Sequence, residues 1–521
     1  MSVIVYLVAY YFLIVHSSEA ARILAVFPIP SISHQVVFRP LTHELARRGH
    51  DVTVITPDPF FPKGKTPPNL TEIDVHDISY GIWNEKFVAT APKGSKNEVL
   101  AIMSTIIDAL TVIVDAQLQD KNVQELIRDK TKKFDLLLIE ACVRPALGYT
   151  YIYKAPVIQV SSLGAALDNY ATIGAPVHPF LYPAVTRQRL NNLSLWDKVA
   201  EFYINFLIDK IYADSQPFEN AMLRKHFGSE IPPVAELNNN VDMLFLNVHP
   251  VFEGIRPVPP SVVYMGGLHQ KPEKDLPADL TSYLDSSKRG VIYISFGTNV
   301  DPTLLPADRI QVLIKTFSQL PYDILWKWNN DELPGRTNNI RISKWLPQSD
   351  LLKHPNIKLF ITQGGLQSTD EAITAGVPMI GIPMFGDQYY NVEKYEYFKI
   401  GVGVNMETLT EENLKEAIDT VINDNSFRQN IIELRSVMRD EPMPPLERAV
   451  WWTEHVLRHG GARHLRAPAA NMSWAQYLEL ELVLTLLFAI LTVTCLWIII
   501  LRYIYKYITK NCEMVLKLKS T

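Results

Sequence analysis

His34 follows the first strand that the sequence predicts. The apolar run from Arg22 to Pro28 is typical of a buried strand, and a helix is expected from Gln35 to Arg48. Open α/β sheets bind their ligands beyond the carboxyl ends of the strands, which is where His34 would lie. A neutral imidazole at this point could take a proton from a reacting hydroxyl group. A capping or surface role is the ordinary alternative for a single histidine in a loop.

Glu140 ends another predicted strand, Phe134 to Glu140, at the same edge of the sheet. Its carboxylate could hold His34 by a hydrogen bond and stabilise the imidazolium that forms when the base is protonated. Taken alone, a solvated acid at the end of a strand is the simpler interpretation. The pair is more informative than either residue, because the first strand and a later strand can be neighbours in a doubly wound sheet.

A second group of polar side chains surrounds Gly364-Gly365. A strand from Leu359 to Thr362 runs into the two glycines, and a helix is expected to begin at about Leu366. The unpaired N–H groups at the start of a helix, together with its dipole, can bind a diphosphate without a lysine. A glycine-bearing turn of an ordinary α/β protein is the alternative, and it would be preferred for the two glycines alone.

Side chains beside these glycines extend the predicted anion site. Gln363, Gln367 and Ser368 can donate hydrogen bonds. Glu371 lies one helical turn after Gln367, from where it could reach a pair of ribose hydroxyls. The segment Ser295-Phe296-Gly297-Thr298, at the end of another predicted strand, adds a second loop with a glycine and hydroxyl groups. Together these loops predict a nucleotide-diphosphate site in the second half of the chain.

Two series of strands must position these residues. Short apolar runs alternate with longer helical stretches, which is typical of parallel sheets covered on both faces. The sequence therefore predicts two doubly wound α/β domains. The first series comprises Arg22 to Pro28, Asp51 to Pro57, Phe134 to Glu140 and Pro156 to Ser161, and the second comprises Val291 to Gly297, Tyr322 to Trp328, Ile340 to Leu346, Leu359 to Thr362 and Pro378 to Pro383.

A proline-rich segment separates the two series. Pro257, Pro259 and Pro260 interrupt regular structure, and the domain boundary is predicted near Pro260. The stretch from Ala171 to Gly228 is less regular and rich in Phe, Tyr, Leu and Ile. It predicts a helical insertion that lines an apolar pocket or touches a membrane surface, and an ordinary pair of core helices is an equal alternative.

Both ends of the chain carry membrane-type segments. Val3 to Val15 is apolar and is followed by small residues, so residues 1–20 predict a signal peptide that is cleaved after Ala20. Leu482 to Leu501 is uncharged over a length that crosses a bilayer, and the tail after it is cationic. Because the cationic side of an anchor faces the cytosol, the large body is predicted to be luminal in a type I membrane protein.

Short motifs agree with that topology. Lys517 and Lys519, fifth and third from the end, resemble the dilysine retrieval signal of endoplasmic reticulum residents. The triplets that begin at Asn69, Asn192 and Asn471 are N-glycosylation sequons and fit luminal exposure. The endoplasmic reticulum membrane is therefore the predicted location.

Composition narrows the classes of partner. The 521 residues carry a net charge of −5 without the basic stripe that binds a phosphate backbone, so no nucleic-acid partner is expected. The sequence has three cysteines, Cys142, Cys495 and Cys512, and one of them lies in the predicted luminal body. A disulfide framework or a cysteine metal site within that body is therefore excluded. No Asp-x-Asp motif stands at a suitable strand end, so no metal is expected.

The segment from Trp345 to Gln388 resembles the nucleotide-sugar signature of the UDP-glycosyltransferase family, whose members have the GT-B fold. The resemblance spans nearly the whole chain, and the Gln363 to Ser368 sequence is similar to that of invertebrate members. It also covers the His34 loop, the strand that ends at Glu140, Met265 to Leu268, the Ser295 loop, Pro445 to Arg466, the predicted anchor and the basic tail.

The resemblance implies a role for each residue of the two polar groups. His34 would be the general base, and Glu140 would stand where the family has its supporting aspartate. Trp345 would stack on uracil, Gln348 and Glu371 would hold the nucleoside, and Asp387 with Gln388 would bind sugar hydroxyls. The complete set of implied UDP-sugar-binding residues is Ser295, Gly297, Thr298, Trp345, Gln348, Gln363, Gly364, Gly365, Gln367, Ser368, Glu371, Asp387 and Gln388.

Two positions depart from the family's pattern. Gln363 replaces a histidine that is often found before the double glycine, and it can donate a hydrogen bond but carry no positive charge. Glu140 is one methylene longer than the usual aspartate, so its carboxylate must reach His34 from a slightly withdrawn backbone. Because Gln363 carries no positive charge, we expect diphosphate binding to be weaker or to be shared among different residues.

The resulting hypothesis is an α/β protein of the GT-B fold that transfers a hexosyl group, with inversion, from a UDP-sugar to a hydroxyl of a small lipophilic acceptor. The UDP-sugar is a co-substrate, and no other cofactor is expected. Glucose and glucuronic acid both remain open as donor sugar, with glucose favoured, and a homo-oligomer is left open.

Three alternatives to this hypothesis remain. They are an enzyme of the same fold that acts on a lipid, a nucleotide-sugar epimerase, and a non-catalytic protein that binds lipophilic molecules. The expected segments are 21–260 for the acceptor domain, 261–440 for the UDP-sugar domain, 441–481 for a C-terminal helix and juxtamembrane segment, 482–501 for the transmembrane helix and 502–521 for the cytosolic tail.

Overall fold

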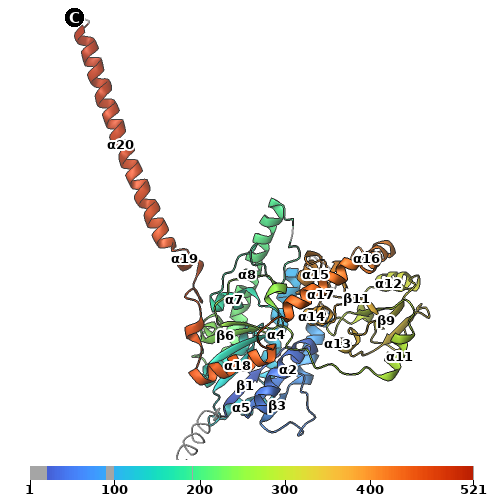
Figure 1. Cartoon of the computed structure of the whole chain (residues 1–521). Helices are drawn as coiled ribbons and strands as arrows, with labels where there is room; N and C mark the ends of the chain where they lie inside the picture. The colour runs from blue at the N-terminus through green and yellow to red at the C-terminus, as the bar shows by residue number, and fades with distance from the viewer. Residues whose placement is uncertain (1–19, 90–98, 191, 520–521) are drawn as a thin grey trace, which may run out of the picture. The chain divides into compact units, whose positions relative to one another are not determined.

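The computed structural model describes residues 20–89, 99–190 and 192–519 (Figure 1). The chain separates into two compact units, Met1–Pro468 and Ala469–Thr521. The larger unit contains two parallel sheets, and the smaller unit contains the helix that is predicted to cross the membrane. The predicted signal peptide lies outside the described residues, except for Ala20.

The first sheet has seven parallel strands within the described residues, in the order β3-β2-β1-β4-β5-β6-β7. The direction of winding reverses between β1 and β4, which are hydrogen-bonded neighbours. Doubly wound sheets bind ligands beyond the carboxyl ends of the strands at such a reversal. The strands are β1 (Arg22–Val26), β2 (Asp51–Thr56), β3 (Leu70–Asp74), β4 (Leu136–Glu140), β5 (Val157–Ser161), β6 (Val241–Leu246) and β7 (Val262–Tyr264).

Helix α2 (Ile32–Arg47) connects β1 to β2, and it begins three residues before the predicted Gln35. Its residues Val37, Leu41 and Leu45 recur at helical spacing and are buried against the sheet. The other helices of this domain are α3 (His76–Trp83), η1 (Asn84–Val88), α4 (Val99–Gln117), α5 (Lys121–Arg128), η3 (Arg144–Gly148), α6 (Tyr149–Tyr153), α7 (Leu167–Ile173), α8 (Leu195–Phe227), α9 (Val234–Leu237), η4 (Asn238–Asn240) and α10 (Pro250–Glu253).

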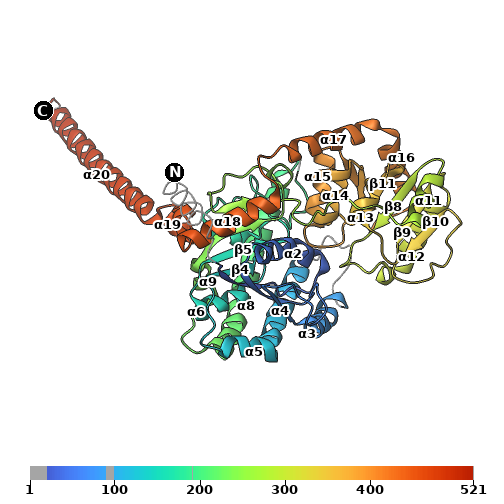
Figure 2. The ribbon, with the colours of Figure 1, turned by 60° about the horizontal axis from the view of Figure 1, so that its bottom comes forward.

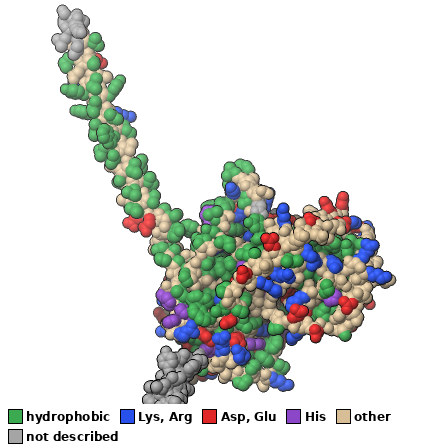
Figure 3. Space-filling model, in the orientation of Figure 1, with side chains coloured by type: hydrophobic (Ala, Val, Ile, Leu, Met, Phe, Trp, Pro, Cys, Tyr) green, Lys and Arg blue, Asp and Glu red, His purple; other side chains and the backbone are tan. Residues whose placement is uncertain are grey.

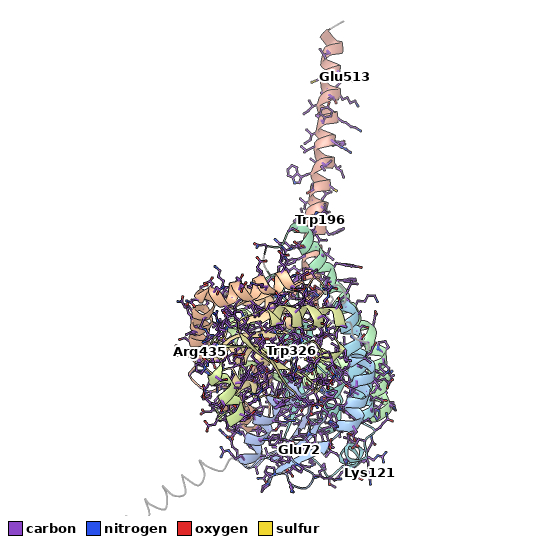
Figure 4. The ribbon with its side chains drawn as sticks, turned by 90° about the vertical axis from the view of Figure 1, so that its right-hand side faces the viewer. Glu72, Lys121, Trp196, Trp326, Arg435 and Glu513 are labelled. Carbon is purple, nitrogen blue, oxygen red and sulfur yellow. The ribbon has the colours of Figure 1, made fainter. Side chains whose placement is uncertain are left out.

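The irregular stretch that the sequence suggested is dominated by α8, which has 33 residues. A buried pair, Arg144 and Glu219, fixes its C-terminal half, with Nη2 and Oε2 3.0 Å apart. Its N-terminal half is exposed, and Trp196, labelled in Figure 4, is 79% accessible to solvent. The helix is therefore not one of an ordinary pair of core helices.

The second sheet has six parallel strands among the residues that the structure describes, in the order β10-β9-β8-β11-β12-β13. Here the winding reverses between β8 and β11, so both sheets place a switch point at the ends of two adjacent strands. Figure 2 shows β4 and β5 in one domain and β8, β9 and β11 in the other. The strands are β8 (Val291–Ser295), β9 (Asp323–Lys327), β10 (Ile340–Ser343), β11 (Ile357–Thr362), β12 (Met379–Gly381) and β13 (Gly401–Gly403).

Helices on the two faces of the second sheet bury its apolar side chains. Trp326 of β9 is completely buried in this core and is labelled in Figure 4. Helix α14 begins at Leu366, as predicted. The helices are α11 (Ala278–Ser286), η5 (Pro302–Leu304), α12 (Ala307–Ser318), α13 (Gln348–Leu351), α14 (Leu366–Ala375), α15 (Gln388–Tyr397), α16 (Glu411–Asn423) and α17 (Asn425–Arg439).

The joint between the sheets lies beyond Pro260. Strand β7 starts at Val262 and pairs with β6, so it completes the first sheet. We therefore propose a boundary after Tyr264. The chain later returns to the first domain through α18 (Pro445–His459), which packs on α2, and Arg48 Nη1 lies 3.1 Å from Glu454 Oε1. A short turn, η6 (Arg463–Leu465), follows α18.

The smaller unit consists of α19 (Trp474–Tyr477) and α20 (Leu480–Lys519). Within the stretch Leu480–Met514 an 18-residue segment has a mean hydropathy of 2.8 and is not buried, and hydrophobic side chains cover the helix (Figure 3). The predicted anchor, residues 482–501, lies inside this stretch. Another helix of the described chain, α4, is similarly apolar over Leu100–Gln117, but 39% of that segment is buried in the first domain.

Candidate active site

A cavity of about 600 Å³ joins the carboxyl ends of the two sheets. The first domain supplies an apolar wall from α3, η1, α4, α8 and the loop after β5, and the second domain supplies a polar wall from the loops after its strands. All the catalytic and UDP-sugar-binding residues predicted from the sequence line this cavity except Glu140 and Gly364. The apolar wall includes Trp83, Phe87, Met103, Ile106, Leu110, Leu163 and Ile208.

His34 and Glu140 form the pair that the sequence predicted. The Nδ1 atom of His34 lies 2.7 Å from Oε1 of Glu140. Because an ionised carboxylate only accepts hydrogen bonds, Nδ1 carries the proton and Nε2 is the nitrogen that can take up another. The adjacent pairing of β1 and β4 creates this contact, since His34 follows β1 and Glu140 ends β4.

Glu140 is completely buried behind His34. Its second carboxylate oxygen, Oε2, accepts a hydrogen bond of 3.1 Å from the backbone N–H of Ile29. Burial raises the pKa of Glu140, and the hydrogen bonds from His34 and Ile29 act in the opposite direction. A desolvated carboxylate interacts strongly with an adjacent positive charge, so Glu140 can stabilise His34 when it becomes protonated.

Two buried glutamines hold the backbone of the loop before His34. The Nε2 atom of Gln35 donates to the carbonyl oxygens of Phe27 and Ile29 at 3.1 Å each. Nε2 of Gln117 donates to the carbonyl oxygen of Pro28 at 2.9 Å. These bonds satisfy carbonyl groups that the sheet no longer pairs, and they fix the position of the histidine.

The diphosphate loops of the prediction lie side by side because β8 and β11 are paired. Gly364 has a φ of 87° and Gly297 a φ of 74°, in the left-handed region that glycine adopts without strain. A side chain on Gly364 would meet Val392 at 2.7 Å. The side chain of Gln363 packs against Gly297. A Cβ atom on Gly297 would lie 2.2 Å from Nε2 of Gln363, which is too close for a side chain at this position. The amide of Gln363 therefore borders both glycine-bearing loops.

Gln348 connects three side chains near the start of α14. Its Nε2 atom donates to Oγ of Ser368 at 2.9 Å and to Oε2 of Glu371 at 2.7 Å. Its Oε1 atom accepts from the hydroxyl of Tyr293 at 3.0 Å. Burial raises the pKa of Glu371, and the hydrogen bond from Gln348 opposes that effect. The predicted nucleoside residues thus form one hydrogen-bonded group.

Trp345 exposes 64% of its surface at the rim of the cavity. An exposed aromatic ring at a cavity rim offers a flat apolar face on which a nucleobase can stack. The exposed ring of Trp345 is therefore accessible for the predicted stacking on uracil.

Asp387 is the N-cap and Gln388 the first residue of helix α15, and both line the cavity. Gln388 Oε1 accepts hydrogen bonds from the backbone N–H groups of Met384 and Phe385, at 2.9 and 3.1 Å. Asp387 Oδ2 accepts from Asn391 Nδ2 at 2.9 Å. Burial raises the pKa of Asp387, and the charge of His34 opposes this, so the predicted sugar-binding acid and the predicted base are electrostatic neighbours.

Polar contacts cross from one domain to the other at the cavity. Oγ of Ser31 lies 3.0 Å from Oδ1 of Asn299, which joins the His34 loop to the Ser295 loop. Nε2 of Gln367 donates to the carbonyl oxygen of Ser162 at 2.8 Å. Gln367 thus contacts the first domain, and its assignment to the diphosphate stays a prediction.

The sequence predicted that the stretch Ala171 to Gly228 lines an apolar pocket or touches a membrane, and Ile208 of α8 does line the cavity. It gave no indication of the rest of the apolar wall, because those residues come from helices whose apolar faces resemble ordinary core. Lys327, which lines the cavity beside Gly297, was also missed. The signal for Lys327 was its position at the end of a predicted strand, Tyr322 to Trp328, next to the strand that ends in the Ser295 loop.

The three sequon asparagines, Asn69, Asn192 and Asn471, are exposed. Each has a positive φ, of 64°, 54° and 59°. Asparagine tolerates this left-handed conformation better than most residues, so backbone geometry alone can account for its presence. Glycosylation at these sites stays a prediction.

Comparison with known proteins gives a consistent result. A model of the family described as "UDP-glucoronosyl and UDP-glucosyl transferase" matches residues 22–514. The chain is 38% identical over 498 residues to an ecdysteroid UDP-glucosyltransferase of Spodoptera littoralis nuclear polyhedrosis virus, covering 92% of this chain and 96% of the relative. It is 33% identical over 519 residues to UDP-glucosyltransferase 2 of Dactylopius coccus, covering 96% and 95%.

Solved structures share the architecture. A UDP-glucose:anthocyanidin 3-O-glucosyltransferase in complex with UDP superposes with a TM-score of 0.57 at 15% identity, covering 85% of this chain and 100% of that one. The glycotransferase of kitacinnamycin gives a TM-score of 0.57 at 18% identity, covering 85% and 99%. These likenesses confirm the predicted GT-B fold.

Proposed function

Because the chain belongs to the UDP-glucoronosyl and UDP-glucosyl transferase family, and is thus an inverting hexosyltransferase, we propose that it transfers glucose from UDP-glucose to a hydroxyl of a small lipophilic acceptor. The observation that carries the proposal is the shared cavity, where the His34–Glu140 pair lies between an apolar wall and the polar loops of the second domain.

In the proposed reaction His34 acts as the general base. Its Nε2 atom takes the proton of the acceptor hydroxyl while that oxygen forms a bond to the anomeric carbon. The bond from this carbon to the β-phosphate oxygen breaks, and its electron pair leaves with UDP. The attack comes from the face opposite the leaving group, so the configuration at the anomeric carbon inverts. Glu140 stabilises the resulting imidazolium.

The relatives support glucose over glucuronic acid as the donor sugar, because those compared above are UDP-glucosyltransferases.

The apolar wall supports a lipophilic acceptor. Trp83, Phe87, Ile106 and Leu110 offer aromatic and aliphatic surface to a ligand, and such surface favours molecules that leave water readily. One relative is named as an ecdysteroid glucosyltransferase, so steroids belong with phenols among the acceptors to be tested.

We expect membranes from cells that express the chain to convert 1-naphthol or a steroid alcohol to its glucoside with UDP-glucose. Turnover with UDP-glucuronic acid should be at least about tenfold slower, because the relatives of the chain are UDP-glucosyltransferases. Mass spectrometry of the products and an assay of released UDP provide the measurement. Binding of acceptors without release of UDP from either donor would contradict the proposal and would favour a non-catalytic lipophile-binding protein.

We also propose that α20 anchors the enzyme in the endoplasmic reticulum membrane with the catalytic body in the lumen. The support is the apolar stretch Leu480–Met514 together with the cationic tail, whose last two residues lie outside the described part of the chain. A chain that ends at Pro468 should appear in the soluble fraction after alkaline carbonate extraction, whereas the full chain should sediment with membranes. Sedimentation of both chains would contradict the assignment of α20 as the anchor.

A further inference from the structure

Lys327 is the last residue of β9 and directly follows Trp326, which is labelled in Figure 4. Strand β9 is hydrogen-bonded to β8, so Lys327 reaches the loop that begins at Ser295. Its Nζ atom donates a hydrogen bond to the carbonyl oxygen of Gly297 and lies 5.3 Å from the centre of the Trp345 ring. The ammonium group is thus placed between the predicted diphosphate loop and the predicted uracil platform.

The positive charge of Lys327 has no matching carboxylate. No Asp or Glu oxygen of the described residues lies within 4 Å of its Nζ atom. Burial lowers the pKa of Lys327, and the more distant charge of Asp301 opposes this effect. A partly desolvated cation is unfavourable unless an anion accompanies it. An anionic ligand in the cavity would supply the missing partner.

Positive charge is otherwise scarce on this side of the cavity. The other lysines that line it, Lys271 and Lys274, belong to the loop that follows β7. Gln363, which also reaches Gly297, is neutral at every pH at which the protein is folded. Lys327 is therefore the lysine that the second sheet itself brings to the diphosphate loop.

We propose that Lys327 binds the diphosphate of the UDP-sugar and supplies there the positive charge that Gln363 cannot carry. This inference rests on the proposed function. When the bond between the anomeric carbon and the β-phosphate oxygen breaks, the electron pair stays on that oxygen, and the Lys327 ammonium stabilises the added charge without giving up its proton.

The test compares the binding of UDP and uridine to the full chain in detergent by isothermal titration calorimetry. Lys327→Met keeps the length of the side chain but removes its charge, and should weaken UDP binding about 10-fold to 100-fold. Uridine affinity should stay within about twofold of wild type, since uridine has no phosphate. Lys327→Arg should keep most of the UDP affinity.

Lys315→Met serves as the matched control, because Lys315 lies on the exposed surface of α12 and pairs with Glu411 outside the cavity. It should bind both ligands as wild type does. Equal UDP affinity of wild type and Lys327→Met would overturn the inference alone. Loss of both ligands in Lys327→Met that Lys327→Arg does not restore would also overturn it, because the role would then be structural. A wild-type chain that binds no UDP would overturn the proposed function.

Discussion

Replacing His34 with alanine should abolish glucosyl transfer and leave UDP binding intact. The imidazole is 2.7 Å from a buried carboxylate and lines the cavity, but it belongs to the first domain and not to the loops predicted to bind UDP. Loss of a general base lowers the rate about 10²-fold to 10⁴-fold. The measurement pairs the rate of UDP release in the presence of acceptor with the UDP dissociation constant from calorimetry.

The matched control for this change is His76→Ala, because His76 is half-exposed and bonds to Asp77 away from the cavity. That variant should retain wild-type turnover. If His34→Ala turned over at a rate within about threefold of wild type, the assignment of His34 as the base would be wrong. If His34→Ala also lost UDP binding, its effect on the rate would report a disturbed cavity instead of a missing base.

Glu140→Gln should lower the rate of transfer about 10²-fold to 10³-fold with little change in UDP affinity. The glutamine carbonyl can still accept the N–H of Ile29, which leaves its NH₂ group facing Nδ1 of His34. Nδ1 must then accept a hydrogen bond, so the proton moves to Nε2 and the ring can no longer take a proton from the acceptor. The measurement is kcat at saturating donor, with the UDP dissociation constant alongside.

The conservative variant Glu140→Asp separates charge from position. It brings back a carboxylate, although the shorter side chain starts from the same backbone. Its rate should exceed that of Glu140→Gln by about tenfold or more, because an acceptor for the Nδ1 proton is present again. Equal rates for the two variants would show that Glu140 acts only by filling space behind His34.

The pairing of His34 with Glu140 could be predicted because it depends on strand order. A chain that reverses its winding after the first strand pairs that strand with a later one, and β4 is that strand. The same reasoning applies to Ser295 and Gln363, which follow the paired strands β8 and β11. Each of these predictions concerned residues at the carboxyl ends of strands. There the order of the strands in the sheet determines which side chains are neighbours.

The strands that were missed had weaker patterns. In β6 the acid Asp242 interrupts the apolar run, yet it is buried because it accepts hydrogen bonds from the N–H groups of Val157 and Ala462, at 3.0 and 2.8 Å. Strand β7 has three residues and follows the prolines that mark the joint. Strand β13 is glycine-rich, and β3 lies at the edge of its sheet and carries two acidic residues, Glu72 and Asp74. Glycine and acidic residues are both uncommon in strands.

The individual residues of the apolar wall could not be predicted for a different reason. Phe87, Ile106 and Ile208 come from separate helices, and the direction of each side chain depends on how its helix packs against the sheet. A one-residue rotation of α8 would exchange a cavity residue for a buried or an exposed one. Helix periodicity shows which residues are apolar but not whether they face a ligand or the core.

The most direct test of the account is a side-by-side assay of wild type and His34→Ala with UDP-glucose and 1-naphthol, in which glucoside and UDP are both quantified. We predict one molecule of glucoside for each UDP that wild type releases, and at least about 10²-fold slower formation of both products by His34→Ala, although both proteins bind UDP with the same affinity. Formation of the glucoside by His34→Ala at the wild-type rate, or a wild-type chain that binds UDP-glucose and acceptor without forming any glucoside, would contradict it.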